Sequence, residues 1–273
     1  MAMMLVNGTP ADSIPLTDRG LAYGDGVFRT LCAVDGRPLH WARQYAKLNS
    51  DCAALQIPCP DAATLLAEVR AASAAVAQAS VKIIVTRGSG PRGYALPQPC
   101  SPMRVVIADA YVPSPRNDSG VTLHLCRLRL AHQPALAGVK HLNRLENVLA
   151  RAEWSDAAVA EGLLLNQTEH VIGGTMSNLF VVENNTLITP DLSRCGVAGV
   201  TRARVIDLAK QAGVTCRVEA VSLQRVLDAD AMFVVNSLIG LWPVARLAER
   251  SWTPNALSKQ VAQWLKADDA ARH

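Results

Sequence analysis

The 273-residue sequence contains no long hydrophobic run, no cluster of basic residues and no basic leader followed by an apolar core. Its longest apolar stretches, such as residues 229–235, are far shorter than the roughly 20 residues that cross a bilayer. Residues 1–4 lack the pattern of a secretory signal peptide. Lys and Arg are scattered and the net charge is only +4. We therefore expect a cytoplasmic protein that binds neither membrane nor nucleic acid.

The seven cysteines form no CxxC pair and no Cys/His ligand spacing, so we expect no metal site. A scattered, odd set predicts free thiols in a reducing compartment. Five histidines fall in no spacing typical of a nucleophile elbow or a zinc protease, so each is expected to be a structural or surface residue; these are His40, His124, His132, His141 and His170. The glycine-rich loop at residues 87–94 lacks the Gly-Lys-Ser/Thr ending of a nucleotide P-loop.

About half of the residues are hydrophobic, which suffices for two modest domains or one large domain. Residues 113–120 combine proline with polar residues, as a linker does. We therefore expect an N-terminal domain at residues 1–112, a linker at 113–120 and a C-terminal domain at 121–273. The pattern of strands and helices predicts an α+β protein.

Hydrophobic periodicity predicts the elements. Strands are expected at residues 4–7, 27–34, 81–86, 103–111, 121–130, 162–166, 179–182, 187–189, 214–219 and 231–236. Helices are expected at residues 39–55, 61–77, 201–212 and 254–266, and after Asn143. Asp35-Gly36 and Asn184-Asn185 predict tight turns, and Asp61 is a candidate helix cap.

The run GVKHLNRLE at residues 138–146 is the most informative stretch. Lys140 follows a small apolar segment and precedes a helix, for which Asn143 and Glu146 could form a capping box. One face of that helix is apolar, with Leu145, Val148, Leu149 and Ala152. A lysine between buried apolar residues and a helix start tends toward a lowered pKa, which suits a nucleophile or a Schiff-base partner. The alternative is a solvated loop lysine.

Residues 140–146 resemble the segment that carries the cofactor lysine in the fold-type IV family of pyridoxal-phosphate enzymes, which includes the branched-chain and D-amino-acid aminotransferases. The resemblance extends from residues 18–20 to residues 242–244. It implies a two-domain fold-type IV enzyme with a cofactor cleft between its domains. It also implies pyridoxal 5'-phosphate on Lys140, a homodimer and a small-molecule substrate.

The run GVAGVTR at residues 196–202 leads into a predicted helix. Small residues let the backbone approach an anion, and the N–H groups at a helix start bind it. An ordinary loop-to-helix turn is the alternative. The resemblance places the phosphate at Gly199, Val200 and Thr201, with Ser237 on another side. It also implies cofactor contacts at Ser177 and Asn178.

The family usually places an arginine on its first long helix against the phosphate, and this sequence has Lys47 there. Lysine keeps the charge and loses the bidentate grip of arginine. Lys47 as a solvated helix residue is the alternative. Gln44 falls where the family commonly has a histidine.

A second departure concerns the ring nitrogen of the cofactor. The family usually has a glutamate a few residues before its Asn-Leu-Phe element, and Gly173 stands at that position here. Either another carboxylate reaches the ring nitrogen or the nitrogen lacks an anionic partner. Without one the ring withdraws electrons more weakly, which disfavours transamination more than it disfavours a lyase whose product becomes aromatic.

The resemblance implies a lyase that splits 4-amino-4-deoxychorismate into 4-aminobenzoate and pyruvate, with Lys140 as general base. Arg92, Tyr94 and Arg29 are candidate ligands of the substrate, and Thr30 could assist. The rival interpretations are a branched-chain or D-amino-acid aminotransferase of the same fold and a non-catalytic relative.

Overall fold

The computed structural model describes residues 3–113 and 119–271, which form two units. The first comprises residues up to Val112 together with Val139–Asn143, and the second comprises Pro113–Gly138 and Arg144–Ala271. The chain passes between units after Val112, and residues 114–118 of the expected linker lie outside the described residues. We expected Lys140 in the second domain. The structure groups it with the first unit, because the Phe28 N–H donates to the Lys140 carbonyl (2.9 Å).

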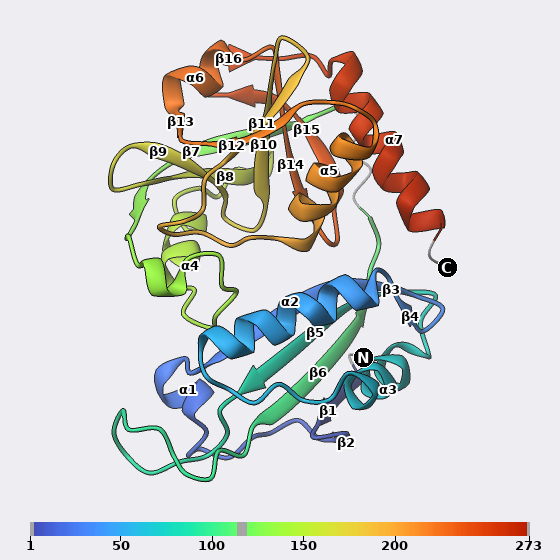
Figure 1. Ribbon diagram of the computed structural model, residues 1–273, viewed down its shortest axis with the longest axis vertical. Helices are drawn as coiled ribbons and strands as arrows, with labels where there is room; N and C mark the ends of the chain where they lie inside the picture. Colours follow the sequence, from blue (N-terminus) through green and yellow to red (C-terminus); the bar gives the residue numbers. More distant parts are fainter. Residues whose placement is uncertain (1–2, 114–118, 272–273) are drawn as a thin grey trace. The chain divides into compact units, whose positions relative to one another are not determined.

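The first unit is built on a six-stranded antiparallel sheet with the order β2-β1-β6-β5-β3-β4 (Figure 1). Its strands are β1 (Met3–Val6), β2 (Thr9–Pro10), β3 (Gly26–Val34), β4 (Arg37–Pro38), β5 (Gln78–Thr86) and β6 (Met103–Ala110). Its helices are α1 (Arg19–Tyr23), α2 (Trp41–Ala54) and α3 (Ala62–Ser73).

Alternation along β3 explains how this unit packs. Val27 and Leu31 point into the core formed with α2 and α3, while Phe28 and Thr30 lie half-buried on the opposite face. The core includes Leu48 of α2 together with residues of α3 and the neighbouring strands. Helices thus cover one face of the sheet, and Phe28 and Thr30 lie on the opposite face.

The second unit contains a ten-stranded mixed sheet with the path β12-β11-β10-β14-β15-β7-β8-β9-β13, and β16 pairs with β15. The strands are β7 (Val121–Leu130), β8 (Val159–Asn166), β9 (His170–Gly174), β10 (Asn178–Glu183), β11 (Thr186–Pro190), β12 (Cys216–Glu219), β13 (Val221–Ser222), β14 (Ala231–Asn236), β15 (Gly240–Leu247) and β16 (Arg250–Ser251). The helices are α4 (Leu145–Arg151), α5 (Val200–Gln211), α6 (Leu223–Asp228) and α7 (Ala256–Ala270), with a 3-10 turn at Pro134–Leu136.

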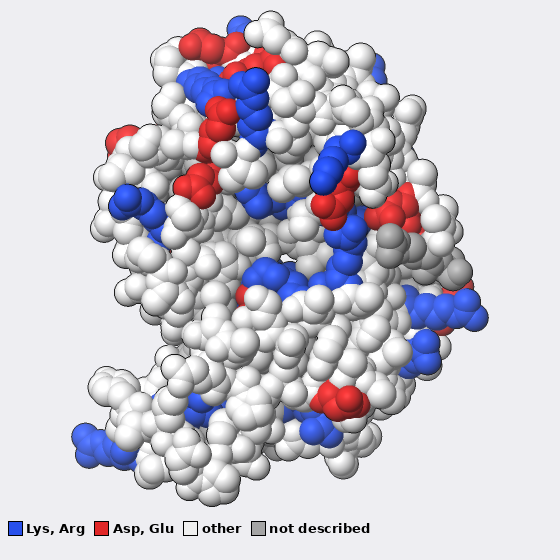
Figure 2. Space-filling view, in the orientation of Figure 1, with Lys and Arg blue, Asp and Glu red and all other residues white. Residues whose placement is uncertain are grey.

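Helices α5 and α7 pack on one another beside the strands β10 and β14 (Figure 1). Val205 of α5 and Val261 of α7 share a core with the stacked rings of Phe180 and Phe233. On the face drawn in Figure 2, basic and acidic side chains of this unit lie next to one another. Arg225, for example, pairs with Glu183 and Glu219.

Several local signals in the sequence act as expected. Asp35 and Gly36 both have positive φ (47° and 73°) between β3 and β4, and Asn184 and Asn185 (46° and 59°) turn β10 into β11. Asp61 caps α3 by accepting from the Thr64 N–H at 2.9 Å. These predictions are confirmed.

The predicted start of the helix after the lysine was wrong. Helix α4 begins at Leu145 with Arg144 at its N-cap and no side-chain capping bond, while the Asn143 side chain lies against Gly24. Glu146 accepts instead from the Ala131 N–H at 2.8 Å.

All seven cysteines are free thiols, as expected. Within the ranges 3–113 and 119–271, no helix is long and apolar enough to span a membrane. The same residues contain no group of three or more His, Cys, Asp or Glu side chains that could hold a metal ion.

Candidate active site

Lys140 lies on a short segment that β3 fixes in place. Besides the bond from Phe28, the Leu142 N–H donates to the Gly26 carbonyl (2.9 Å), and Val139 is buried in the core of the first unit. The half-buried Lys140 side chain places its Nζ 4.8 Å from the centre of the Phe28 ring. A lysine held over an aromatic face has a restricted position. A side chain that must reach one particular reacting atom needs such a restriction.

Asp51, which sequence reasoning did not single out, connects the lysine segment to α2 and β3. Its carboxylate is 1% exposed. Oδ1 accepts from Lys47 Nζ, one helical turn earlier, and Oδ2 accepts from Arg29 (3.3 Å) and from the Lys140 backbone N–H (3.4 Å). The i,i+4 spacing of Lys47 and Asp51 was the only sequence signal for this cluster.

Asp51, Lys47 and Arg29 form a group that we call the Asp51 cluster. It contains two cationic side chains and one carboxylate. Burial lowers the pKa of Lys47, the charge of Asp51 opposes this shift, and the charge of Arg29 adds to it. Burial also lowers the pKa of Arg29, again against the effect of Asp51. By formal charge the cluster has two cationic side chains for one carboxylate, which suits an environment that receives anions.

The structure gives Arg29 a different place from the one expected. Its guanidinium is 3% exposed and paired with Asp51, and it lies on the face of β3 opposite Phe28 and Thr30. A buried guanidinium paired with a carboxylate supports the lysine segment through Asp51, and a role of Arg29 toward substrate stays a prediction. Thr30 is half-buried and shares the face of Phe28, whose ring contacts Lys140.

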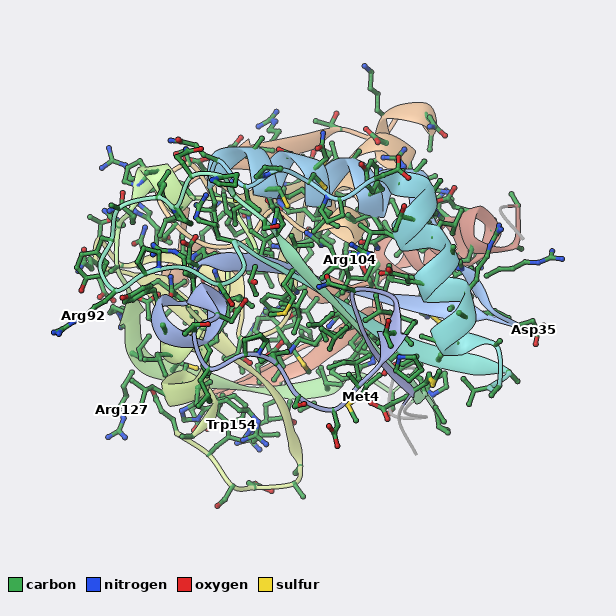
Figure 3. The ribbon with its side chains drawn as sticks, turned by 90° about the horizontal axis from the view of Figure 1, so that it is seen from below. Met4, Asp35, Arg92, Arg104, Arg127 and Trp154 are labelled. Carbon is green, nitrogen blue, oxygen red and sulfur yellow. The ribbon has the colours of Figure 1, made fainter. Side chains whose placement is uncertain are left out.

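Arg92 and Tyr94 belong to the loop between β5 and β6, and both side chains are exposed. Tyr94 is 85% exposed and its ring packs against that of Tyr23 (5.4 Å between centres). Arg92 points outward (Figure 3) and has no hydrogen-bond or ion-pair partner in the described part of the chain. Neither joins the Asp51 cluster, so their role toward substrate stays a prediction.

In the second unit, the start of α5 forms a candidate anion site. Gly199 is its N-cap, no side chain caps the helix, and no acidic residue lies in its first turn. Asn178 fixes this turn by donating to the Val197 carbonyl (2.8 Å) and accepting from the Gly199 N–H (3.1 Å). A Cβ at position 199 would lie 2.3 Å from Asn178 Oδ1, so the position requires glycine.

Two hydroxyls complete this site. Thr201 is 2% exposed, and its Oγ1 lies 3.5 Å from Ser237 Oγ at the end of β14. The structure thus brings together Asn178, Gly199, Thr201 and Ser237, four of the residues for which the resemblance implies cofactor contacts. Uncapped N–H groups of a 12-residue helix beside two hydroxyls match the donors that a phosphate binds, so the residues present fit the phosphate of the expected cofactor.

Glu161 is a second functional candidate that sequence reasoning missed. This buried carboxylate accepts from the N–H groups of Gly162 (2.8 Å), Thr175 (2.9 Å) and Met176 (3.1 Å). It also accepts from the hydroxyls of Thr175 (2.5 Å) and Ser177 (2.8 Å). It therefore orders the turn that leads into Asn178. Its signal in the sequence was a lone acidic residue inside the apolar strand VAEGLLLN.

The region around Gly173 explains how the family's missing glutamate is accommodated. A Cβ at Gly173 would lie 2.9 Å from the Ser177 carbonyl oxygen, and one at Gly174 would lie 2.6 Å from Glu161 Oε2. The backbone of this turn therefore leaves no room for a side chain at position 173. Glu161, the carboxylate beside it, is already bound by five donors.

Comparison with known proteins identifies the class to which this fold and site belong. The family model for amino-transferase class IV matches residues 26–247, and the chain belongs to that family. The crystal structure of 4-amino-4-deoxychorismate lyase from Pseudomonas aeruginosa superposes with a TM-score of 0.92 at 46% identity, covering 97% of this chain and 98% of that one. The aminodeoxychorismate lyase of Vibrio harveyi is 39% identical over 249 residues, which are 90% of this chain and 92% of that protein.

Two aminotransferases share less sequence identity with this chain. A putative branched-chain-amino-acid aminotransferase of Methanocaldococcus jannaschii is 29% identical over 87% of this chain and 83% of its own length. The Escherichia coli branched-chain enzyme superposes with a TM-score of 0.84 at 19% identity, covering 96% of this chain and 92% of that one, which shows the fold alone. The predicted fold-type IV class is confirmed.

Proposed function

We propose that this protein is a pyridoxal-phosphate-dependent lyase that converts 4-amino-4-deoxychorismate to 4-aminobenzoate and pyruvate, a step toward folate. The observation that carries the proposal is the placement of Lys140, whose backbone is held by β3 and Asp51 and whose Nζ lies against Phe28. The lyase relatives match this chain along nearly its full length.

The residues proposed to hold the cofactor come from both units. Lys140 Nζ would bind the aldehyde, and the start of α5, together with Thr201 and Ser237, would bind the phosphate. Once bound, the pyridine ring draws electron density from the substrate atoms attached to its aldehyde carbon. Asn178 holds the Gly199 turn, and Ser177 is oriented by Glu161. The contact of Lys47 with the phosphate stays a prediction, since its ammonium pairs with Asp51.

Lys140 performs the proton transfers. With its Nζ not bonded to the cofactor, Lys140 would act as general base and remove the proton from C4 of the substrate ring. The electrons of that bond form the aromatic ring as the carbon–oxygen bond to the enolpyruvyl group breaks. Lys140 or a water molecule then protonates the departing enol, which becomes pyruvate. Thr30, on the Phe28 face of β3, is our candidate for assisting this step.

The turn at Gly173 favours the lyase over the aminotransferase reaction. A transaminase relies on a strongly electron-withdrawing ring, which an anionic partner at the ring nitrogen provides. Position 173 supplies no carboxylate, and the carboxylate of Glu161 is occupied by donors of its own turn. Aromatisation of the product reduces the demand on the ring.

Borohydride trapping tests the proposal. After reduction with the cofactor, the wild type should carry a stable adduct on the peptide that contains Lys140. Lys140→Ala should carry none and lose at least about 100-fold in pyruvate release. Lys210→Ala, a change in the exposed last turn of α5, should behave as wild type.

Each alternative has a distinct outcome in the same assays. An adduct on Lys140 with rapid exchange of amino groups from branched-chain or D-amino acids, and without pyruvate release, would identify an aminotransferase. A chain that takes up no cofactor would be a non-catalytic relative.

We further propose that the enzyme is a cytoplasmic homodimer. Seven free thiols agree with a reducing compartment. The outer face of α4 exposes Leu145 (75%), Val148 (60%) and Leu149 (60%), which a second copy of the chain would bury.

A further inference from the structure

Two cysteines of the first unit contact one another outside the Asp51 cluster. Cys52 lies in the last turn of α2 and is fully buried, while Cys59 is half-buried in the loop that leads to α3. The chain reverses direction between them, because the N–H groups of Leu55 (3.1 Å) and Ile57 (2.9 Å) both donate to the Cys52 carbonyl. This reversal brings the two thiols close to one another, with Cys59 packed against the core to which Cys52 belongs.

The surroundings hold the second thiol in place. Cys59 stands between Pro58 and Pro60, whose rings restrict the backbone. The Tyr45 hydroxyl donates to the Pro60 carbonyl (3.0 Å) and also hydrogen-bonds with the Cys59 sulfur. The reversal itself is fixed by Arg87, which donates to the carbonyls of Leu55 (2.6 Å) and Gln56 (2.8 Å).

The thiolate is the reactive form of cysteine, and the thiols of this chain differ in how easily they ionise. The hydrogen bond with Cys52 lowers the pKa of Cys59, burial opposes this shift, and the bond with Tyr45 adds to it. Burial raises the pKa of Cys126 to about 12 and that of Cys195 and Cys216 to about 11. Cys59 therefore combines partial solvent access with a lowered pKa, unlike Cys126, Cys195 and Cys216.

We propose that Cys52 and Cys59 form an oxidation site, which a hydroperoxide converts to an intramolecular disulfide. The Cys59 thiolate attacks the peroxide, so that an S–O bond forms, the O–O bond breaks and hydroxide leaves. The Cys52 sulfur then attacks Cys59; the S–S bond forms, the S–O bond breaks, and water departs with the proton of Cys52. Overall, two thiols and one hydrogen peroxide give one disulfide and two waters.

A non-reducing peptide map of the full-length protein after treatment with hydrogen peroxide tests this site. We expect a cross-linked pair of peptides containing Cys52 and Cys59, about 2 Da lighter than the two thiols together, which dithiothreitol returns to the free forms. This readout is a mass, so it is independent of the lyase activity proposed above.

Two variants separate the steps. Cys52→Ala should leave a sulfenic acid on Cys59 that a 1,3-dione labels, and Cys59→Ser should give no cross-link and an unlabelled Cys52. Cys32→Ser, a change at a buried thiol of β3, should still form the Cys52–Cys59 disulfide. Absence of the cross-link in the wild type, or oxidation of another cysteine before Cys59, would overturn the proposal.

Discussion

At the scale of single residues, Asp51 links the lysine segment to α2 and β3, because one buried carboxylate faces two cations and a backbone N–H. Burying charge is favourable only while each charge keeps its partner. Arg29 and Lys47 therefore depend on Asp51, and Lys140 depends on the same carboxylate through its backbone. The backbone of Lys140, the proposed catalytic residue, is therefore bound to a cluster that contains none of the reacting atoms of the proposed reaction.

We predict that Asp51→Asn destabilises the protein by about 3–5 kcal/mol, since it removes the carboxylate that pairs with the buried guanidinium of Arg29. Urea unfolding followed by circular dichroism measures this. Asp109→Asn, at an exposed position of β6, should change stability by no more than about 0.5 kcal/mol. Equal stability of the two variants would show that Arg29 and Lys47 do not need the carboxylate.

Thr201 gives a prediction about the cofactor. Thr201→Val keeps the shape of the side chain and removes the hydroxyl, so we expect cofactor affinity to fall about tenfold, equivalent to about 1.4 kcal/mol. An absorbance titration with pyridoxal 5'-phosphate measures this. Thr215→Val, at an exposed position before β12, serves as control. Unchanged affinity would place the phosphate elsewhere.

At the scale of elements, the loop between β5 and β6 is anchored at its base. Asp25 accepts hydrogen bonds from Arg19 Nε (2.8 Å) and from Arg87 Nε (2.8 Å), and both guanidinium groups are buried. Arg19 also donates to the Gly93 carbonyl near the tip of the loop (2.9 Å). The exposed Arg92 and Tyr94 are therefore carried by a loop whose base is held by ion pairs.

Asp25 makes this anchor pH-dependent. Burial alone would raise the pKa of Asp25, but the hydrogen bonds and charges of Arg87 and Arg19 outweigh burial and hold the pKa below its usual value. The ionised carboxylate therefore stabilises the folded state fully above the unfolded pKa of about 3.9, and this contribution is lost as the pH falls through the folded-state pKa.

We predict that Asp25→Asn lowers the free energy of unfolding at pH 7 by about 2–4 kcal/mol and makes its decrease below pH 4 shallower. Denaturant titrations between pH 2 and pH 7 measure both effects, and hydrogen exchange should increase in residues 88–101. Asp35→Asn keeps a residue suited to positive φ and should leave the acid limb unchanged. A parallel pH profile in Asp25→Asn would contradict the assignment.

At the scale of the whole molecule, the exposed apolar face of α4 bears on assembly. We predict a native mass of twice the 29.2-kDa chain for the wild type and a monomer for Leu149→Glu, because the charge would be buried in the interface. Light scattering after size exclusion measures both masses. Val218→Glu, at an exposed apolar position of β12, should remain a dimer. A dimeric Leu149→Glu or a monomeric wild type would be the contrary result.

The sequence by itself determined the features that local chemistry controls. The turns at Asp35-Gly36 and Asn184-Asn185, the cap at Asp61 and the glycine at the start of α5 follow from short-range backbone requirements. The run around Lys140 determined the family, because several side chains stand there at fixed spacing in a single segment.

Only the tertiary structure decided which distant side chains meet. Asp51 reaches Arg29 and the Lys140 backbone across 22 and 89 residues, and Glu161 reaches Thr175 and Ser177 across the β8–β9 hairpin. The tertiary structure also decided that Arg29 is buried against Asp51 and that the apolar side of α4 is exposed. Burial and pairing depend on what the folded chain places opposite each side chain, and no local pattern contains that information.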